Sequence, residues 1–107
     1  MTHREIIRAV GTIGLALFAS SPAFAADVPG MTCSEIATFA RQVALQKTER
    51  VALIDALRRL RQSLGVEHAD TEHELEKIVR AIYGMQIFST ASPEEVGTAY
   101  QTACEMG

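Results

Sequence analysis

The stretch Met31-Thr32-Cys33-Ser34-Glu35-Ile36 decides how this chain folds, because it combines a helix start with the first of two cysteines. The Thr32 hydroxyl is placed to accept a hydrogen bond from the backbone N–H of Glu35, and the Glu35 carboxylate can reach back to the N–H of Thr32. Met31 and Ile36 occupy the two positions of a hydrophobic staple around this capping box. The stretch therefore predicts a helix that begins directly after Thr32.

The same helix-start signature occurs twice more. It is found at Thr71-Glu72-His73-Glu74 and at Ser92-Pro93-Glu94-Glu95. In the last of these, the proline stands at the first helical position, where its missing N–H costs no hydrogen bond. Three capping boxes in so short a chain predict an all-α domain, a small bundle of three or four helices.

Apolar residues recur at helical spacing in four segments, so that each segment can bury one face. The four stripes are Ile36, Phe39, Ala40 and Val43; Leu53, Leu57, Leu60 and Leu64; Leu75, Ile78, Val79 and Ile82; and Val96, Ala99, Tyr100 and Ala103. Gly65 and Gly84 follow two of the stripes as expected helix stops. Between the first two stripes, residues 46–50 are polar all round. This favours a break near Thr48 over one continuous helix from Cys33 to Leu64, which would span ~46 Å.

The first 25 residues have the pattern of a secretory signal peptide. Arg4 and Arg8 precede an apolar run over residues 9–19, and Ala23 and Ala25 form a small-residue cleavage site. The apolar run is well short of the ~20 residues that cross a bilayer. We expect cleavage after Ala25 and no stable membrane insertion afterwards; an uncleaved N-terminal anchor is the alternative. The predicted organisation is a signal peptide over 1–25, a short lead over 26–31 and a helical domain over 32–107.

The composition narrows the class of protein. The chain has 107 residues, of which 48% are apolar and 21% charged, which excludes a disordered chain. After cleavage at Ala25, 82 residues would remain, with eight basic and twelve acidic side chains and a charge of -4. An acidic chain of this kind offers no electrostatic basis for binding nucleic acid. So small an exported domain usually needs a covalent or metal staple.

Cys33 and Cys104 are the chain's two cysteines, and they supply such a staple. They stand in the first turn of the first predicted helix and the last turn of the last one. An oxidising compartment and an even count favour a disulfide between them, with an intermolecular bridge or two free thiols as alternatives. The chain-entropy relation gives a bridge over a loop of this length about 4 kcal/mol of stabilisation.

Candidate chemical groups are few. His68, Asp70 and His73 are weak candidates for metal ligands, but the two histidines lack the i, i+4 spacing of a helical zinc site, so we expect a solvated helix start, no metal and no cofactor. Both histidines lie in one polar stretch, which leaves no basis for a catalytic triad; we expect no catalytic residues and no enzyme.

Arg58, Arg59 and Arg61 form a basic group on the second predicted helix. We expect a solvated face, on which Asp55 can pair with Arg58 or Arg59 at i, i+3 or i+4. We therefore predict no nucleic-acid partner for this face.

The segment that follows Gly84 is the most suggestive feature for binding. Its position between Gly84 and the helix start at Ser92 predicts a loop, yet it contains Met85, Ile87 and Phe88. These side chains could fold under the bundle as a lid on the core. They could also form an exposed apolar patch for another protein or for a second copy of this chain, as in a homodimer. The residues leave both readings open.

Several motifs resemble those of small exported helical proteins of Gram-negative bacteria that have no assigned function. The motifs are Met-Thr-Cys-Ser-Glu at 31–35, Glu-Lys-Ile-Val-Arg-Ala-Ile-Tyr at 76–83, Ser-Pro-Glu-Glu at 92–95 and Ala-Cys-Glu at 103–105. A more distant resemblance is to HdeA-type acid-stress chaperones, which are also small, helical and closed by one disulfide, with a Thr-Cys like Thr32-Cys33 at the start of the fold. Both resemblances imply a periplasmic location.

The first functional expectation is a small periplasmic, non-enzymatic interaction or binding protein of unknown partner. The alternative is an acid-responsive periplasmic chaperone. Protonation of twelve carboxylates would change the charge of the processed chain from -4 to about +11, a swing that is compatible with acid activation. A third alternative is an enzyme of unknown substrate.

Overall fold

The computed structural model describes residues 26–64 and 68–107, and all regular structure within these ranges is helical. The elements are α2 (Cys33–Thr48), α3 (Leu53–Leu64), α4 (Ala69–Gly84), the short 3-10 helix η2 (Gln86–Phe88) and α5 (Pro93–Met106). The predicted all-α class is therefore confirmed. The predicted signal peptide over residues 1–25 and the expected stop at Gly65 lie outside the described residues.

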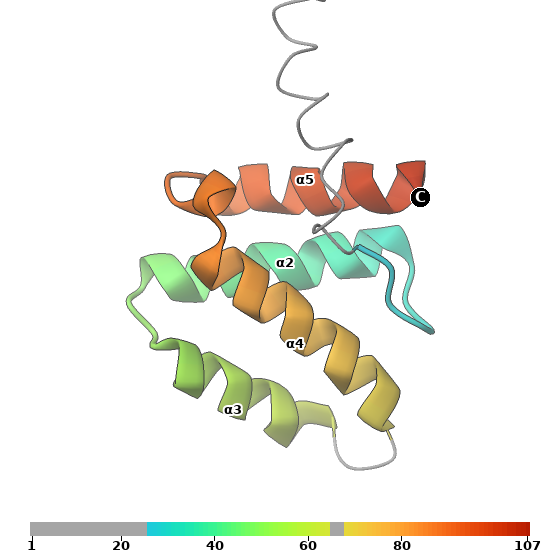
Figure 1. Cartoon of the computed structure of the whole chain (residues 1–107), viewed down its shortest axis with the longest axis horizontal. Coiled ribbons are helices and arrows are strands. Elements are labelled where there is room, and N and C mark those ends of the chain that lie inside the picture. Colours follow the sequence, from blue (N-terminus) through green and yellow to red (C-terminus); the bar gives the residue numbers. More distant parts are fainter. Residues whose placement is uncertain (1–25, 65–67) are drawn as a thin grey trace, which may run out of the picture.

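The helices form a chain of neighbours rather than a symmetric bundle (Figure 1). Helix α5 lies antiparallel to α2, which also packs on α4, and α3 packs mainly on α4. Helices α5 and α3 therefore lie at opposite edges of the domain, and η2 connects the end of α4 to the start of α5. None of the helices in the described part of the chain is long and apolar enough to cross a membrane.

The core is built from the predicted apolar stripes. The stripe of α4 is buried along its whole length, and most members of the other three stripes are also buried. The side chains with almost no exposed surface are Tyr100, Ile36, Ile78, Ile82, Val28, Val79 and Val96. Four predicted members of the stripes lie only partly buried at the edge of this core: Phe39, Leu53, Leu64 and Ala103.

Small residues allow α2 and α5 to approach closely. Gly97 of α5 is buried against α2, and a Cβ atom at this position would lie 3.3 Å from the backbone oxygen of Ala37 and 3.2 Å from Nε of Arg41. Both distances are tighter than ordinary van der Waals contact. A glycine is therefore favoured here, although glycine lowers helix propensity.

Helix α2 ends at Thr48, so the predicted break is confirmed. The next residues form a Schellman motif, in which the N–H groups of Arg50 and Val51 bond back to carbonyl groups of the last turn of α2, each at 3.0 Å. Arg50 has a φ of 66°, the left-handed conformation that glycine usually provides at this position. The Tyr83 hydroxyl of α4 donates to the Val51 carbonyl oxygen at 2.7 Å and holds the turn against the domain.

Cys33 and Cys104 form an intramolecular disulfide, as predicted. Their Cα atoms are 5.5 Å apart, and 71 positions separate them in the sequence. The bridge joins the first residue of α2 to the last turn of α5. It therefore ties together the two ends of the helical domain.

The predicted capping box at Thr71 is wrong. Helix α4 begins at Ala69, three residues before the predicted first residue Glu72, and its N-cap residue His68 makes no side-chain capping bond. The hydroxyl of Thr71 instead lies 3.5 Å from the carbonyl oxygen of Pro29, and Glu74 pairs with Lys77 at 3.3 Å. Thr71 therefore lies inside α4, where it is not the N-cap residue.

Two further expectations need correction. Gly84 was expected just after the end of α4, but it is the last residue of the helix. Met85 is the C-cap residue, and its N–H donates to the Ala81 oxygen at 2.8 Å. The lead over residues 26–31 is non-helical as predicted, yet it belongs to the core. Ala26 and Val28 are only 7% and 2% exposed.

Candidate binding groove

The segment that carries Met85, Ile87 and Phe88 forms a tight corner between α4 and α5. Met85 caps α4, and the N–H of Phe88 donates to the Met85 oxygen at 3.0 Å to form the single turn of η2. Helix α5 then begins at the third predicted capping box. There the Glu95 N–H donates to Ser92 Oγ at 3.1 Å, and the Ser92 N–H donates to Glu95 Oε1 at 2.8 Å.

The corner divides the three apolar candidates between the core and the surface. Phe88 is 2% exposed and stacks on the ring of Tyr100, with ring centroids 5.8 Å apart. Met85 lies partly buried against the core, whereas Ile87 is 43% exposed. Phe88 and Met85 therefore close the core as a lid, and Ile87 is the member that belongs to a surface patch.

Lys47 holds the corner in place from α2. Its ammonium group donates to the Ile82 oxygen at 2.9 Å and to the Phe88 oxygen at 3.4 Å. These carbonyl groups lie near the end of α4 and at the end of η2, where a cation is favourable. The sequence analysis missed this residue, because a lysine in the last turn of an amphipathic helix does not indicate which distant carbonyl groups it will reach.

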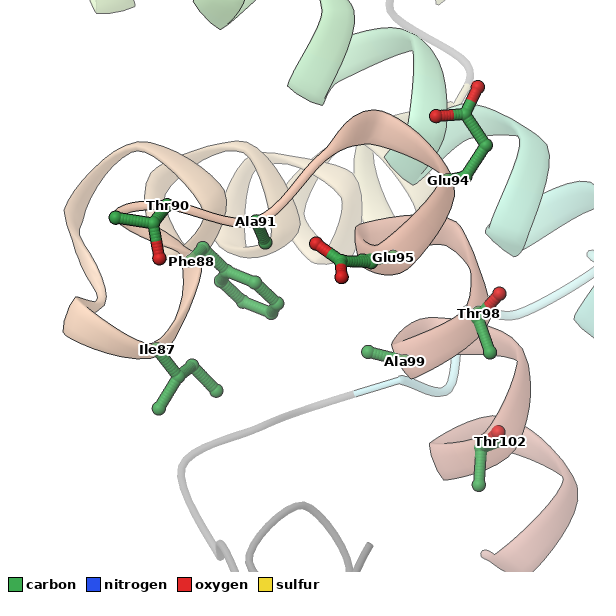
Figure 2. A pocket seen from close by; sticks show the side chains of 9 residues that line it. All are labelled: Ile87, Phe88, Thr90, Ala91, Glu94, Glu95, Thr98, Ala99 and Thr102. Carbon is green, nitrogen blue, oxygen red and sulfur yellow. The ribbon is translucent and has the colours of Figure 1, made fainter. Parts of the chain in front are cut away.

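A surface groove with a volume of about 550 Å³ lies between the corner and α5 (Figure 2). Its apolar lining residues are Ile87, Phe88, Ala91 and Ala99. Its polar lining residues are Thr90, Glu94, Glu95, Thr98 and Thr102. The groove therefore combines an aromatic and aliphatic surface with hydroxyl and carboxylate groups, the usual composition of a binding site.

The two carboxylates at the groove differ in direction. In Figure 2 the side chain of Glu95 extends toward Phe88, whereas that of Glu94 points away from the ring. Glu95 is also held in position, because one of its carboxylate oxygens accepts the Ser92 N–H. Glu95 is thus the oriented anionic group of the groove.

The sequence analysis missed the residues that α5 contributes to this groove. Glu94, Thr98 and Thr102 recur at i, i+4 and i+8, and Glu95 directly follows Glu94, which places the four residues along one side of the helix. Such a polar stripe marks only a solvent-facing side. The apolar half of the groove comes from the corner, whose placement depends on the tertiary structure.

A smaller cavity of about 170 Å³ lies on the α2 and α4 side of the corner. Lys47, Ile82 and Val96 are among its lining residues, and Phe88 and Ala91 line both this cavity and the groove. The corner therefore forms a wall that is shared by the two spaces.

The weak metal candidates do not come together. Three exposed residues lie in the first turns of α4 or directly before it: His68, Asp70 and His73. Figure 1 shows that this part of α4 is far from η2. Over residues 26–64 and 68–107, no three histidine, cysteine, aspartate or glutamate side chains lie where they could hold a metal ion. These three residues contribute nothing to the groove.

The arginines of α3 are exposed and partly engaged with carboxylates. Arg58 pairs with Asp55, one of the two pairings expected for that aspartate. Arg61 Nε lies 3.2 Å from a Glu76 carboxylate oxygen and 3.7 Å from one of Glu72, so it links α3 to α4. Exposed pairs of this kind contribute little stability.

The two tyrosines are the titratable groups with perturbed properties. Burial raises the pKa of the Tyr100 hydroxyl far above its ordinary value. Burial also raises the pKa of Tyr83, and the charge of nearby Arg59 offsets part of that increase. Both phenols are therefore neutral at physiological pH, which suits a role in packing.

Comparison with known proteins was made at three levels. A scan against protein-family models found no match, and neither the curated proteins nor the solved structures included a similar chain.

Proposed function

We propose that this protein is a small periplasmic, non-enzymatic binding protein that takes up a segment of another protein in the groove between η2 and α5. The observation that carries the proposal is the groove itself. It places exposed Ile87 beside an oriented carboxylate, over the buried Phe88 ring, in a space of about 550 Å³. This volume is within the range of ligand sites in proteins.

Export from the cytoplasm is part of the proposal. The pattern of residues 1–25 supports it, and so does the Cys33–Cys104 disulfide, since disulfides persist mainly in oxidising compartments. Buried Ala26 directly follows the expected cleavage site, so the folded domain would begin at the new N-terminus.

The groove can be tested with a neutral probe. The full chain is expressed with its leader, and the exported product is labelled with ¹⁵N and titrated with a short peptide that alternates leucine and glutamine. We expect amide shifts to concentrate at Ile87, Thr98 and Thr102. Ile87→Ser should remove the shifts without loss of stability, since Ile87 is exposed.

Ile54→Ser is the matched control, because Ile54 is 64% exposed on α3 at the opposite edge of the domain. It should leave the peptide shifts unchanged. Shifts that spread evenly over the surface, or that respond equally to both variants, would show that the groove is not a binding site.

A second candidate function, an acid-responsive chaperone, is favoured by the link between Arg61 and the carboxylates of Glu72 and Glu76. These exposed ion pairs link α3 to α4, and the disulfide keeps the chain ends together if that link is lost. Circular dichroism and apolar-dye binding at pH 7 and pH 3 test this function. Reversible loosening with suppression of client aggregation supports it, and an unchanged fold at pH 3 excludes it.

A further inference from the structure

The C-terminal part of the chain has an unusual charge pattern. No lysine, arginine or histidine occurs after Arg80, and three glutamates lie in α5: Glu94, Glu95 and Glu105. Within residues 26–64 and 68–107, the groove is lined by this part of the chain alone. These lining residues offer carboxylates and hydroxyls to a ligand, and none of them has a cationic side chain.

Glu95 is the negatively charged residue that lies beside the apolar part of the groove. Its carboxylate extends toward the Phe88 ring, and Ala91 and Ala99 lie on the chain at either side of it (Figure 2). The capping bond from the Ser92 N–H uses one carboxylate oxygen and restricts the side chain. A carboxylate that is already oriented loses less conformational entropy when it pairs with a ligand.

We infer that the groove selects a peptide segment in which a bulky apolar side chain stands beside lysine or arginine. The apolar side chain would pack against Ile87, above the buried Phe88 ring. The cation would pair with Glu95, and the hydroxyls of Thr98 and Thr102 would bond to polar groups of the segment. This inference rests on the proposed function and adds the charge of the ligand to it.

Two substitutions isolate the charge of Glu95. Glu95→Gln removes the negative charge but keeps the capping box, because glutamine serves at this position as well as glutamate. Glu94→Gln makes the same charge change at the next residue of the same helix, where the carboxylate points away from Phe88. Both variants should therefore keep the fold and the stability of the parent.

The test compares three short peptides in which leucine alternates with lysine, glutamine or glutamate, titrated into the exported protein and both variants. We expect the lysine peptide to bind the groove more tightly than the glutamine peptide, and the glutamate peptide to bind weakest. Glu95→Gln should lower the affinity for the lysine peptide about threefold to fivefold, as for a partly exposed ion pair, and Glu94→Gln should change it less. Added salt should weaken the lysine peptide selectively.

Each contrary outcome has a distinct meaning. Equal affinity for the lysine and glutamine peptides in the groove overturns the charge selection and leaves the proposed function standing. Equal losses in both variants overturn the assignment to Glu95. If no peptide changes the amide shifts of the groove residues, the proposed function itself is overturned. A dimer, seen by light scattering, that dissociates in Glu95→Gln would place a second copy in the groove instead.

Discussion

Removal of the disulfide is the perturbation whose magnitude follows most directly from the structure. We consider the double variant Cys33→Ser and Cys104→Ser, since both cysteines are only partly buried and serine has a similar size. The bridge links residues separated by 71 positions. In the chain-entropy relation, a closed loop of that length stabilises the folded state by about 4 kcal/mol at 25 °C.

This loss is large for so small a domain. Total unfolding free energies of proteins are about 5–15 kcal/mol, and a domain of this size belongs at the low end of that range. With roughly 4–8 °C of melting temperature per kcal/mol, the variant should melt roughly 15–30 °C below the parent. The helix contacts of α2 and α5 remain in the variant, so the fold should persist at low temperature.

Urea unfolding followed by circular dichroism at 25 °C measures the effect. The parent is compared with the double variant and with the parent in reducing agent, which should agree with each other. The slope of free energy against urea should rise when the bridge is absent, because the unfolded chain then exposes more surface. A loss below about 1 kcal/mol in both samples would refute the reasoning, since the unfolded chain would not be restricted as the relation assumes.

Three further predictions concern other parts of the fold. Arg50→Gly should raise the unfolding free energy by about 1 kcal/mol in the same urea assay, because Arg50 has a φ of 66°; an unchanged or lower value contradicts it. Lys47→Met should lower the unfolding free energy by about 1–3 kcal/mol and speed hydrogen exchange in η2, because two carbonyl groups lose their donor; unchanged exchange contradicts it. Absorbance at 295 nm reports only Tyr83 and Tyr100, since the chain has two tyrosines and no tryptophan; their midpoints should lie above pH 10 in the folded protein and near 10 in urea. Both raised pKa values favour the neutral phenol in the fold, so the contribution of the two tyrosines to stability should be constant below pH 10 and fall above it; a native midpoint at or below 10 contradicts this.

Local chemistry made much of the fold predictable. The boxes at Thr32 and Ser92 formed as expected, because the partners of each hydrogen bond lie three residues apart and need no other part of the chain. The box at Thr71 did not form because α4 already begins at Ala69, so Thr71 lies inside the helix; its hydroxyl lies near the Pro29 carbonyl oxygen, 42 positions away in the sequence. Short-range signals therefore placed two of the three helix starts correctly.

The candidate groove was likewise predictable only in part from the local sequence. The apolar content of Met85, Ile87 and Phe88 indicated a special segment, and the residues left open both a lid on the core and an exposed patch. The structure separates them, because Phe88 stacks on Tyr100 and Ile87 remains outside. The corner is also bonded by Lys47, 41 residues before Phe88.

The helical class follows from the amino-acid sequence, which also favours the break near Thr48 and the pairing of Cys33 with Cys104 over their alternatives, since spacing, capping and redox chemistry are properties of short segments and of residue types. The tertiary structure decided which side of the corner faces the core, that the lead with Val28 belongs to the core, and that Glu95 adjoins an apolar groove. These features arise where segments distant in the sequence pack together. The free energy of that packing depends on all the segments in contact, so the sequence of a single segment does not determine it.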